Sequence, residues 1–307
     1  MSSDKVIKKL ITNEHFSKLA DTTKRHYISR AEILLDMFPH RKDILKPELT
    51  TSTLKRVYLN VRTLLSFFIV LNYLAQVMFK REDLYSPKIS EANKKITDDY
   101  KMGEKTEKED ENWIDWDDYL KKLKELEAEY MDTLEERLKM KRTFTPAEYK
   151  KHQVALAFFL YGVKPLRNDY RTLKIADYNK NKDNYFDMET GEVVLNKYKT
   201  SRSYGKSIFS VPEKLREYIK LLMENRPIES NYLFIKHDGS SLLSSSWSSF
   251  ILRNSERLLG KRVGSQMLRK SYITYKYRNM PSLATMEAEA EGLGHSLGTE
   301  LLTYRKK

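Results

Sequence analysis

The 307-residue sequence contains no cysteine. This absence excludes a disulfide framework, a thiolate zinc site and a cysteine nucleophile. The N-terminus, MSSDKVIKKLI, also lacks the uninterrupted apolar core of a signal peptide. The most apolar run, 64–79, includes Asn72 and Gln76 and is shorter than the roughly 20 residues that a membrane span needs. We therefore expect a soluble, intracellular protein in which 64–79 is a buried core helix.

Acidic residues are too few to balance the basic ones. The chain has 56 Lys and Arg against 43 Asp and Glu, a net charge of +13. Such an excess indicates a polyanionic partner, most simply double-stranded DNA, although a well-solvated basic surface would give the same total. The chain is long enough for two domains and a sizeable core.

The N-terminal third has helical periodicity throughout. Apolar spacing predicts helices up to about residue 38 and a long helix over 54–81, and residues 1–80 carry 14 basic against 7 acidic side chains. The polar stretch 82–112, with Pro87 and Gly103, is predicted to be a mobile linker. Residues 1–104 are thus expected to form an all-α DNA-binding domain that ends in a polar linker.

An acidic, amphipathic segment follows at 105–142. Residues 105–136 hold 5 basic and 13 acidic side chains. We expect a helical connector that faces away from phosphate and packs on its own protein or on a partner subunit. A metal site at Asp115, Asp117 and Asp118 is the weaker alternative, because no further ligand completes the shell.

Residues 143–307 combine helices with one strand-forming stretch. Thr145, Pro146 and Glu148 have the pattern of a capped helix start. The stretch 179–212 alternates like a two- or three-stranded antiparallel ribbon, with a turn at 189–191. The predicted fold class is mainly α with a small antiparallel β ribbon, an α+β C-terminal domain behind an all-α N-terminal one.

The last forty residues carry a set of chemically active side chains. Arg269 lies in an apolar-patterned helix, His295 follows Gly294, and Tyr304 stands nine residues after His295. A hydroxyl nucleophile with cationic donors is what attack on a phosphodiester requires without a metal. Taken singly, each residue has a structural explanation, such as a tyrosine in the core or a histidine that caps a helix.

Four separated motifs together resemble the tyrosine recombinase (phage integrase) family. They are PLRNDYRTL around Arg167, YKT with Lys199, QMLRKSYIT around Arg269, and LGHSLGTELLTY with His295 and Tyr304. They occur in the family's order and at its approximate spacings across 145–307. The region before them resembles the family's core-binding domain in layout only.

This resemblance implies DNA cleavage and rejoining through a covalent 3′-phosphotyrosyl intermediate at Tyr304, without metal or cofactor. Arg167 and Arg269 would clamp the non-bridging phosphate oxygens, for which guanidinium groups are suited. Lys199 would protonate the departing 5′ oxygen, and His295 would donate to the phosphate or accept the tyrosine proton. The resemblance further implies self-association on DNA, as dimers to tetramers, in DNA recombination or integration for a virus or mobile element.

Several assignments stay open within that resemblance. Lys197 and Lys206 lie in the same hairpin as Lys199, which is preferred for its YKT context, and Arg167 alone would fit an ion pair with Asp169. Gln266 stands where the family most often has His, and a Gln amide donates a hydrogen bond but shuttles no proton.

Two further positions depart from the family. Lys270 occupies a position where His is common. Only three residues follow Tyr304, so either the chain is truncated or assembly uses another surface, such as the acidic segment. A type IB topoisomerase and a non-catalytic DNA-binding protein with the same fold are the alternatives.

Overall fold

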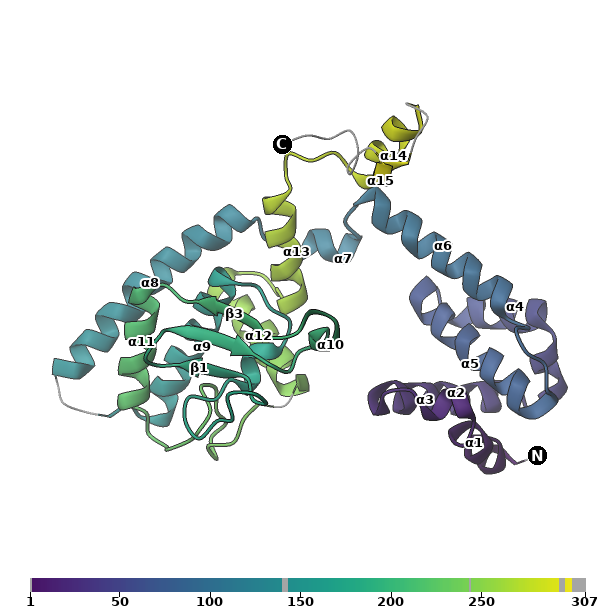
Figure 1. Ribbon diagram of the computed structural model, residues 1–307, viewed down its shortest axis with the longest axis horizontal. Helices are drawn as coiled ribbons and strands as arrows, with labels where there is room; N and C mark the ends of the chain where they lie inside the picture. The colour runs from purple at the N-terminus through teal and green to yellow at the C-terminus, as the bar shows by residue number, and fades with distance from the viewer. Residues whose placement is uncertain (1, 140–142, 243, 293–295, 300–307) are drawn as a thin grey trace. The chain divides into compact units, whose positions relative to one another are not determined.

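The computed structural model describes residues 2–139, 143–242, 244–292 and 296–299. The chain divides into two compact units, the first of Met1–Glu104 with Pro281–Lys307 and the second of Lys105–Met280. Helices dominate both, and a single three-stranded antiparallel sheet lies in the second among the described residues (Figure 1). The expected mainly α composition with a small β ribbon is confirmed at this level.

The first unit is built around helix α5 (Val61–Phe79). Seven of its residues are buried, and α1, α3 and α6 pack against it. By length and composition α5 is the one described helix that is apolar enough to cross a membrane, but its buried face is the core of this unit. The other elements of the unit are α1 (Ser3–Ile11), α2 (Glu14–Ser17), α3 (Asp21–Met37), η1 (Arg41–Leu45), α4 (Pro47–Val57), α6 (Ser86–Met102), α14 (Leu283–Gly292) and α15 (Leu297–Thr299).

Two predictions for this region are wrong. The helix predicted over 54–81 is interrupted, because the Asn60 side chain accepts hydrogen bonds from Arg62 N and Thr63 N and so starts α5 afresh. The stretch predicted to be a linker contains the 17-residue helix α6. Its Pro87 lies in the first turn of α6, and Gly103, with φ of 70°, terminates it. The two residues taken for helix breakers are the start and stop signals of a helix.

The second unit surrounds helix α9 (Pro146–Val163). Eleven of its 18 residues are buried, because the sequence from His152 to Tyr161 is almost continuously apolar. The predicted capping box is present, with Thr145 Oγ1 accepting from Glu148 N at 3.3 Å. The other elements are α7 (Glu107–Glu111), α8 (Trp116–Lys139), η2 (Asp169–Thr172), β1 (Tyr185–Asp187), β2 (Glu192–Leu195), α10 (Ser201–Tyr204), β3 (Ser207–Ser210), α11 (Glu213–Glu224), α12 (Ser244–Leu259) and α13 (Ser265–Lys276).

The predicted ribbon is confirmed as a three-stranded sheet of order β1-β2-β3. Val193 lies opposite Phe186 on one side and Phe209 on the other. The turn between β1 and β2 is held by Asp187 Oδ1, which accepts from Glu189 N at 2.9 Å and Thr190 N at 3.1 Å. Gly191 follows with φ of 73°, a conformation that favours glycine.

The acidic segment packs on its own unit. Leu123, Leu126, Tyr130 and Leu134 of α8 are buried in the core that contains α9 and α11. Because this apolar face is covered, 105–139 belongs to the second unit, while α14 packs on α6 of the first. The division between 104 and 105 coincides with a boundary of the predicted segments 1–104, 105–142 and 143–307. The second unit continues through 142 up to 280, and 281–307 is grouped with the first unit.

Two of the three aspartates considered for a metal form contacts with other side chains. Asp115 accepts from Trp113 Nε1 at 3.0 Å, and Asp117 pairs with Arg278 at 3.1 Å. Within the described ranges, no group of three or more His, Asp and Glu side chains has the arrangement of a metal site.

Candidate active site

The candidate site lies at the C-terminal end of α9, where the chain turns back. Pro165 follows the end of the helix, and two buried tyrosines hold the segment that comes next. Tyr170 Oη shares its proton between the carbonyls of Leu160 (2.9 Å) and Lys164 (2.6 Å), which also accept from backbone N–H groups at the helix end. Tyr161 Oη donates to the carbonyl of Arg167 at 2.6 Å. Arg167 is therefore held by its backbone against the core.

The Tyr161 hydroxyl is itself fixed from the other side. Trp247 Nε1 of α12 donates to it at 3.0 Å, and both side chains are fully buried. Burial raises the pKa of Tyr161 well above its usual value, so the hydroxyl stays protonated and continues to donate to Arg167. The backbone position of one arginine thus depends on a buried aromatic pair.

Arg269 reaches the same place from α13. Its guanidinium Nη1 donates to the carbonyl of Pro165, at a long 3.4 Å. Burial, and then the neighbouring charge of Arg167, lower the pKa of Arg269 from its usual value. The structure therefore brings together two arginines from motifs that are far apart in the sequence.

A carboxylate lies in this arginine group. Burial raises the pKa of Asp169, although Arg171 and, less strongly, Arg167 and Arg269 oppose that shift. Three guanidinium groups around one carboxylate leave the group with a net positive charge. No ion pair of Arg167 with Asp169 is found among the described residues, and one carboxylate could balance only one of the three positive charges.

Asn168 joins the arginine loop to two helices, and sequence reasoning missed it. Its Nδ2 donates to Ser248 Oγ of α12 at 3.0 Å, and its Oδ1 accepts from Ser265 Oγ of α13 at 3.1 Å. Ser265 opens the helix that carries Arg269. The only signal in the sequence is the position of Asn168 directly after Arg167, and nothing local predicts its partners.

Two other residues of α13 have different surroundings. Gln266 is exposed in the first turn, three residues before Arg269, and so lies on the same helix face. Lys270 forms an ion pair with Glu109 of α7, and the hydrogen bond from Lys270 helps to lower the pKa of Glu109 against the opposing effect of burial. Lys270, at the position where the family commonly has His, therefore pairs with a carboxylate of α7.

Lys199 lies apart from the arginines, in the connection between β2 and α10. It is exposed, as are Lys197 of the same connection and Lys206, which lies between α10 and β3. No described residue forms a hydrogen bond or ion pair with its side chain, and no contact joins it directly to Arg167 or Arg269 among the described residues. The structure thus leaves Lys199 accessible on a hairpin without choosing between it and its two neighbours.

The remaining two candidates, His295 and Tyr304, lie outside the described residues. Their predicted roles stay predictions.

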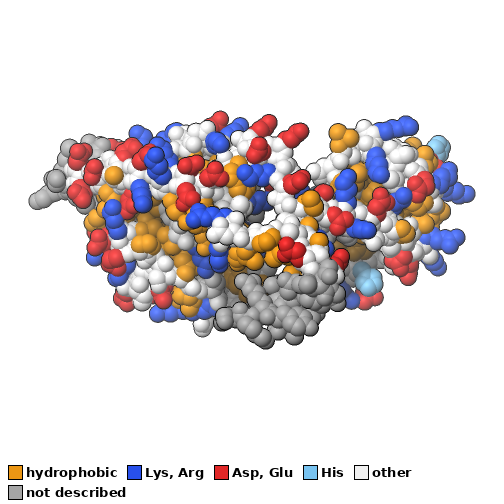
Figure 2. Space-filling view, turned by 90° about the horizontal axis from the view of Figure 1, so that it is seen from above, with side chains coloured by type: hydrophobic (Ala, Val, Ile, Leu, Met, Phe, Trp, Pro, Cys, Tyr) orange, Lys and Arg blue, Asp and Glu red, His pale blue; other side chains and the backbone are white. Residues whose placement is uncertain are grey.

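On the face seen in Figure 2, basic and acidic side chains are interspersed. What distinguishes the arginine pair is chemistry: both guanidinium groups are partly buried and carry forked donors that match phosphate oxygens, and the charge of Arg167 opposes that of Arg269.

No family model matches the sequence, and no curated protein matches it. Among solved structures, the XerA recombinase matches with 12% sequence identity and a TM-score of 0.37, over 100% of this chain and 94% of that one.

Proposed function

We propose that the protein is a site-specific DNA recombinase or integrase that cleaves and rejoins strands by transesterification at Tyr304. The observation that carries this proposal is the meeting of Arg167 and Arg269 at the end of α9, with a net positive charge around Asp169. Two arginines from separate motifs, partly buried and mutually repelling, form a receptor for one phosphate group.

The chemistry follows from these roles. The Tyr304 oxygen attacks the scissile phosphorus, the new O–P bond forms, and the bond to the 5′ oxygen breaks. Arg167 and Arg269 stabilise the charge on the non-bridging oxygens, and Lys199 gives a proton to the departing 5′ oxygen. The tyrosine proton leaves to His295 or to water. Rejoining is the same sequence reversed, so no external energy source is needed.

The substrate is double-stranded DNA, and the protein acts wherever that DNA is held inside the cell. We further propose assembly of dimers to tetramers on paired sites, which mass measurement of the protein with and without a duplex would reveal.

The test is a duplex nicked next to the scissile position, so that cleavage releases a short fragment and traps the covalent complex. Wild type is expected to form an adduct that resists denaturation, and Tyr304→Phe to form none. Tyr277→Phe is the matched control, because Tyr277 is an exposed tyrosine of the described chain and its substitution should leave adduct formation unchanged.

The outcomes separate the alternatives. Binding without any adduct from wild type would contradict the enzyme and favour a non-catalytic DNA-binding protein. If an adduct forms, relaxation of supercoiled plasmid by a monomer without strand exchange between paired sites would favour a type IB topoisomerase.

A further inference from the structure

A buried asparagine controls the start of the connection that carries Lys199. Asn184 is only 5% exposed and directly precedes β1. Its Oδ1 accepts from Asn196 N at 2.9 Å and Lys197 N at 2.7 Å, and its Nδ2 donates to the Lys197 carbonyl at 2.7 Å. One side chain thus binds three main-chain groups of two consecutive residues at the point where β2 ends.

The same amide reaches toward the arginine group. Asn184 Nδ2 lies 3.4 Å from Thr172 Oγ1, at the long end of a hydrogen bond, and Thr172 Oγ1 donates to the carbonyl of Asp169 at 3.3 Å. Thr172 is the last residue of η2, which begins two residues after Arg167. Asn184 therefore links the lysine connection to the element beside the arginines.

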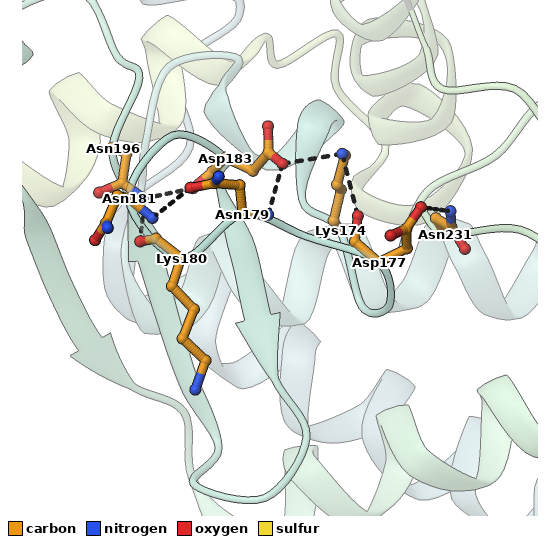
Figure 3. A network of polar contacts seen from close by, with 8 residues as sticks. All are labelled: Lys174, Asp177, Asn179, Lys180, Asn181, Asp183, Asn196 and Asn231. Carbon is orange, nitrogen blue, oxygen red and sulfur yellow. Dashed lines mark hydrogen bonds and ion pairs between the residues drawn. The ribbon is translucent and has the colours of Figure 1, made fainter.

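The surrounding loop holds the strand end in place (Figure 3). Asn196 Nδ2 donates to the carbonyls of Lys180 (3.1 Å) and Asp183 (2.5 Å). The Asp183 carboxylate in turn pairs with Lys174 Nζ at 3.0 Å and accepts from Asn179 N at 2.9 Å. The loop 174–184 is thus closed on itself by one ion pair and fastened to the end of β2 by the amides of Asn184 and Asn196.

Beyond Lys197 the connection is closed on itself. Tyr198 Oη donates to the Gly205 carbonyl at 2.8 Å, and Ser201 N donates to the Tyr198 carbonyl at 3.0 Å. Lys199 lies inside this closed turn with its side chain exposed. Its position therefore depends on how the turn is anchored, and the bonds made by Asn184 fix Lys197, where the turn begins, to the ribbon.

We propose that Asn184 is a positioning residue that holds Lys199 at the departing 5′ oxygen; this rests on the proposed function. An asparagine amide has two donors and an acceptor oxygen, and both ends are used here. Removal of the Asn184 side chain would leave three main-chain groups without hydrogen-bond partners. The connection would then shift to give these groups new partners. A displacement of about 1 Å at a reacting group costs on the order of 10²-fold in rate.

The test uses two nicked duplexes that differ in one atom, the natural 5′ oxygen or sulfur at the bridging position. A thiolate leaves without being protonated. A variant whose only defect is in the general acid should therefore cleave the sulfur duplex at about the wild-type rate. Cleavage by the full-length wild type, Lys199→Ala, Asn184→Ala and Asn184→Asp is timed on both, at a temperature where circular dichroism finds each variant folded. Asn184→Asp keeps the two accepted bonds and removes the donated ones, so it covers the case in which Asn184→Ala does not fold.

We expect Lys199→Ala and the Asn184 variants to be slowed on the oxygen duplex, with Asn184→Ala slower than wild type by about 10²-fold. On the sulfur duplex all are expected to return to within a few-fold of wild type. Asn181→Ala is the matched control, an exposed residue of the same loop that should behave like wild type on both duplexes.

Wild-type rates for the Asn184 variants on the oxygen duplex, or equal slowing on both duplexes, would overturn the positioning role while leaving the proposed function intact. Failure of sulfur to rescue Lys199→Ala would overturn it by removing the acid that Asn184 is proposed to position. No adduct from wild type on either duplex would reject the proposed function and this inference with it.

Discussion

The two halves of the candidate site are fixed in different ways. The arginine half is tied to the hydrophobic core, since the Tyr161 hydroxyl, itself held by Trp247, fixes the carbonyl of Arg167. The lysine half is tied by amide side chains, because the buried Asn184 and its neighbour Asn196 anchor the end of β2. The difference implies that damage to the arginine anchor disturbs the hydrophobic core, whereas damage to the lysine anchor shifts the connection that carries Lys199.

Loss of an arginine should have the largest effect. Arg269→Ala is expected to slow cleavage of the nicked duplex by about 10²–10³-fold, since it removes one preorganised donor to the phosphate. Arg269→Lys should recover only part of the rate, because an ammonium group lacks the forked donor geometry. Arg253→Ala, at an exposed arginine of α12, is the control; equal rates for Arg269→Ala and this control would remove Arg269 from the site.

Loss of the Tyr161 hydroxyl should have the second-largest effect. Tyr161→Phe leaves Trp247 Nε1 and the Arg167 carbonyl without their partner, so the free energy of unfolding should fall by about 1–3 kcal/mol. Urea denaturation measures this change, and the cleavage rate should fall with it. Tyr204→Phe, at a tyrosine that is 78% exposed, should change neither quantity. An unaltered unfolding free energy in Tyr161→Phe would show that the core does not support the arginine half.

Substitution of Gln266 by His should have a smaller effect on the cleavage rate, in the opposite direction. Because Gln266 lies one helical turn before Arg269 and is exposed, His should fit there and supply a charge or proton that Gln lacks. Gln266→His is expected to cleave a few-fold faster than wild type in the nicked-duplex assay. Slower cleavage would count against a position close to the phosphate.

The smallest effect concerns the ion pair of the lysine half. Hydrogen bonding from Asn179 N and pairing with Lys174 lower the pKa of Asp183, so its contribution to stability is present above the unfolded value of about 3.9 and is lost as pH falls through the lower folded value. Asp183→Asn should therefore lower the unfolding free energy by less than about 1 kcal/mol at pH 6. The difference from wild type should shrink below about pH 4, and a constant difference would contradict this pairing.

What the sequence predicted is mainly what short segments determine. The capping box at Thr145 and the turn at Gly191 depend on residues a few positions apart, and both are present. The same local reasoning failed at Pro87 and Gly103, since a polar composition concealed the helix between them.

The contacts that build the site are long-range. The motifs named Arg167 and Arg269, but only the fold shows that they meet and that Asn168 joins their elements. Asn184 carries no local signal at all, because its partners follow a ribbon turn later in the chain. Polar side chains that bind distant backbone groups are recognisable only once the chain is folded.

The most direct test is to identify the residue that carries the DNA. Wild type trapped on the nicked duplex is digested with protease and nuclease, and mass spectrometry locates the nucleotide adduct. The account predicts a 3′-phosphate ester on the peptide that contains Tyr304. An adduct on another residue, or a linkage to the 5′ end of the DNA, would contradict it.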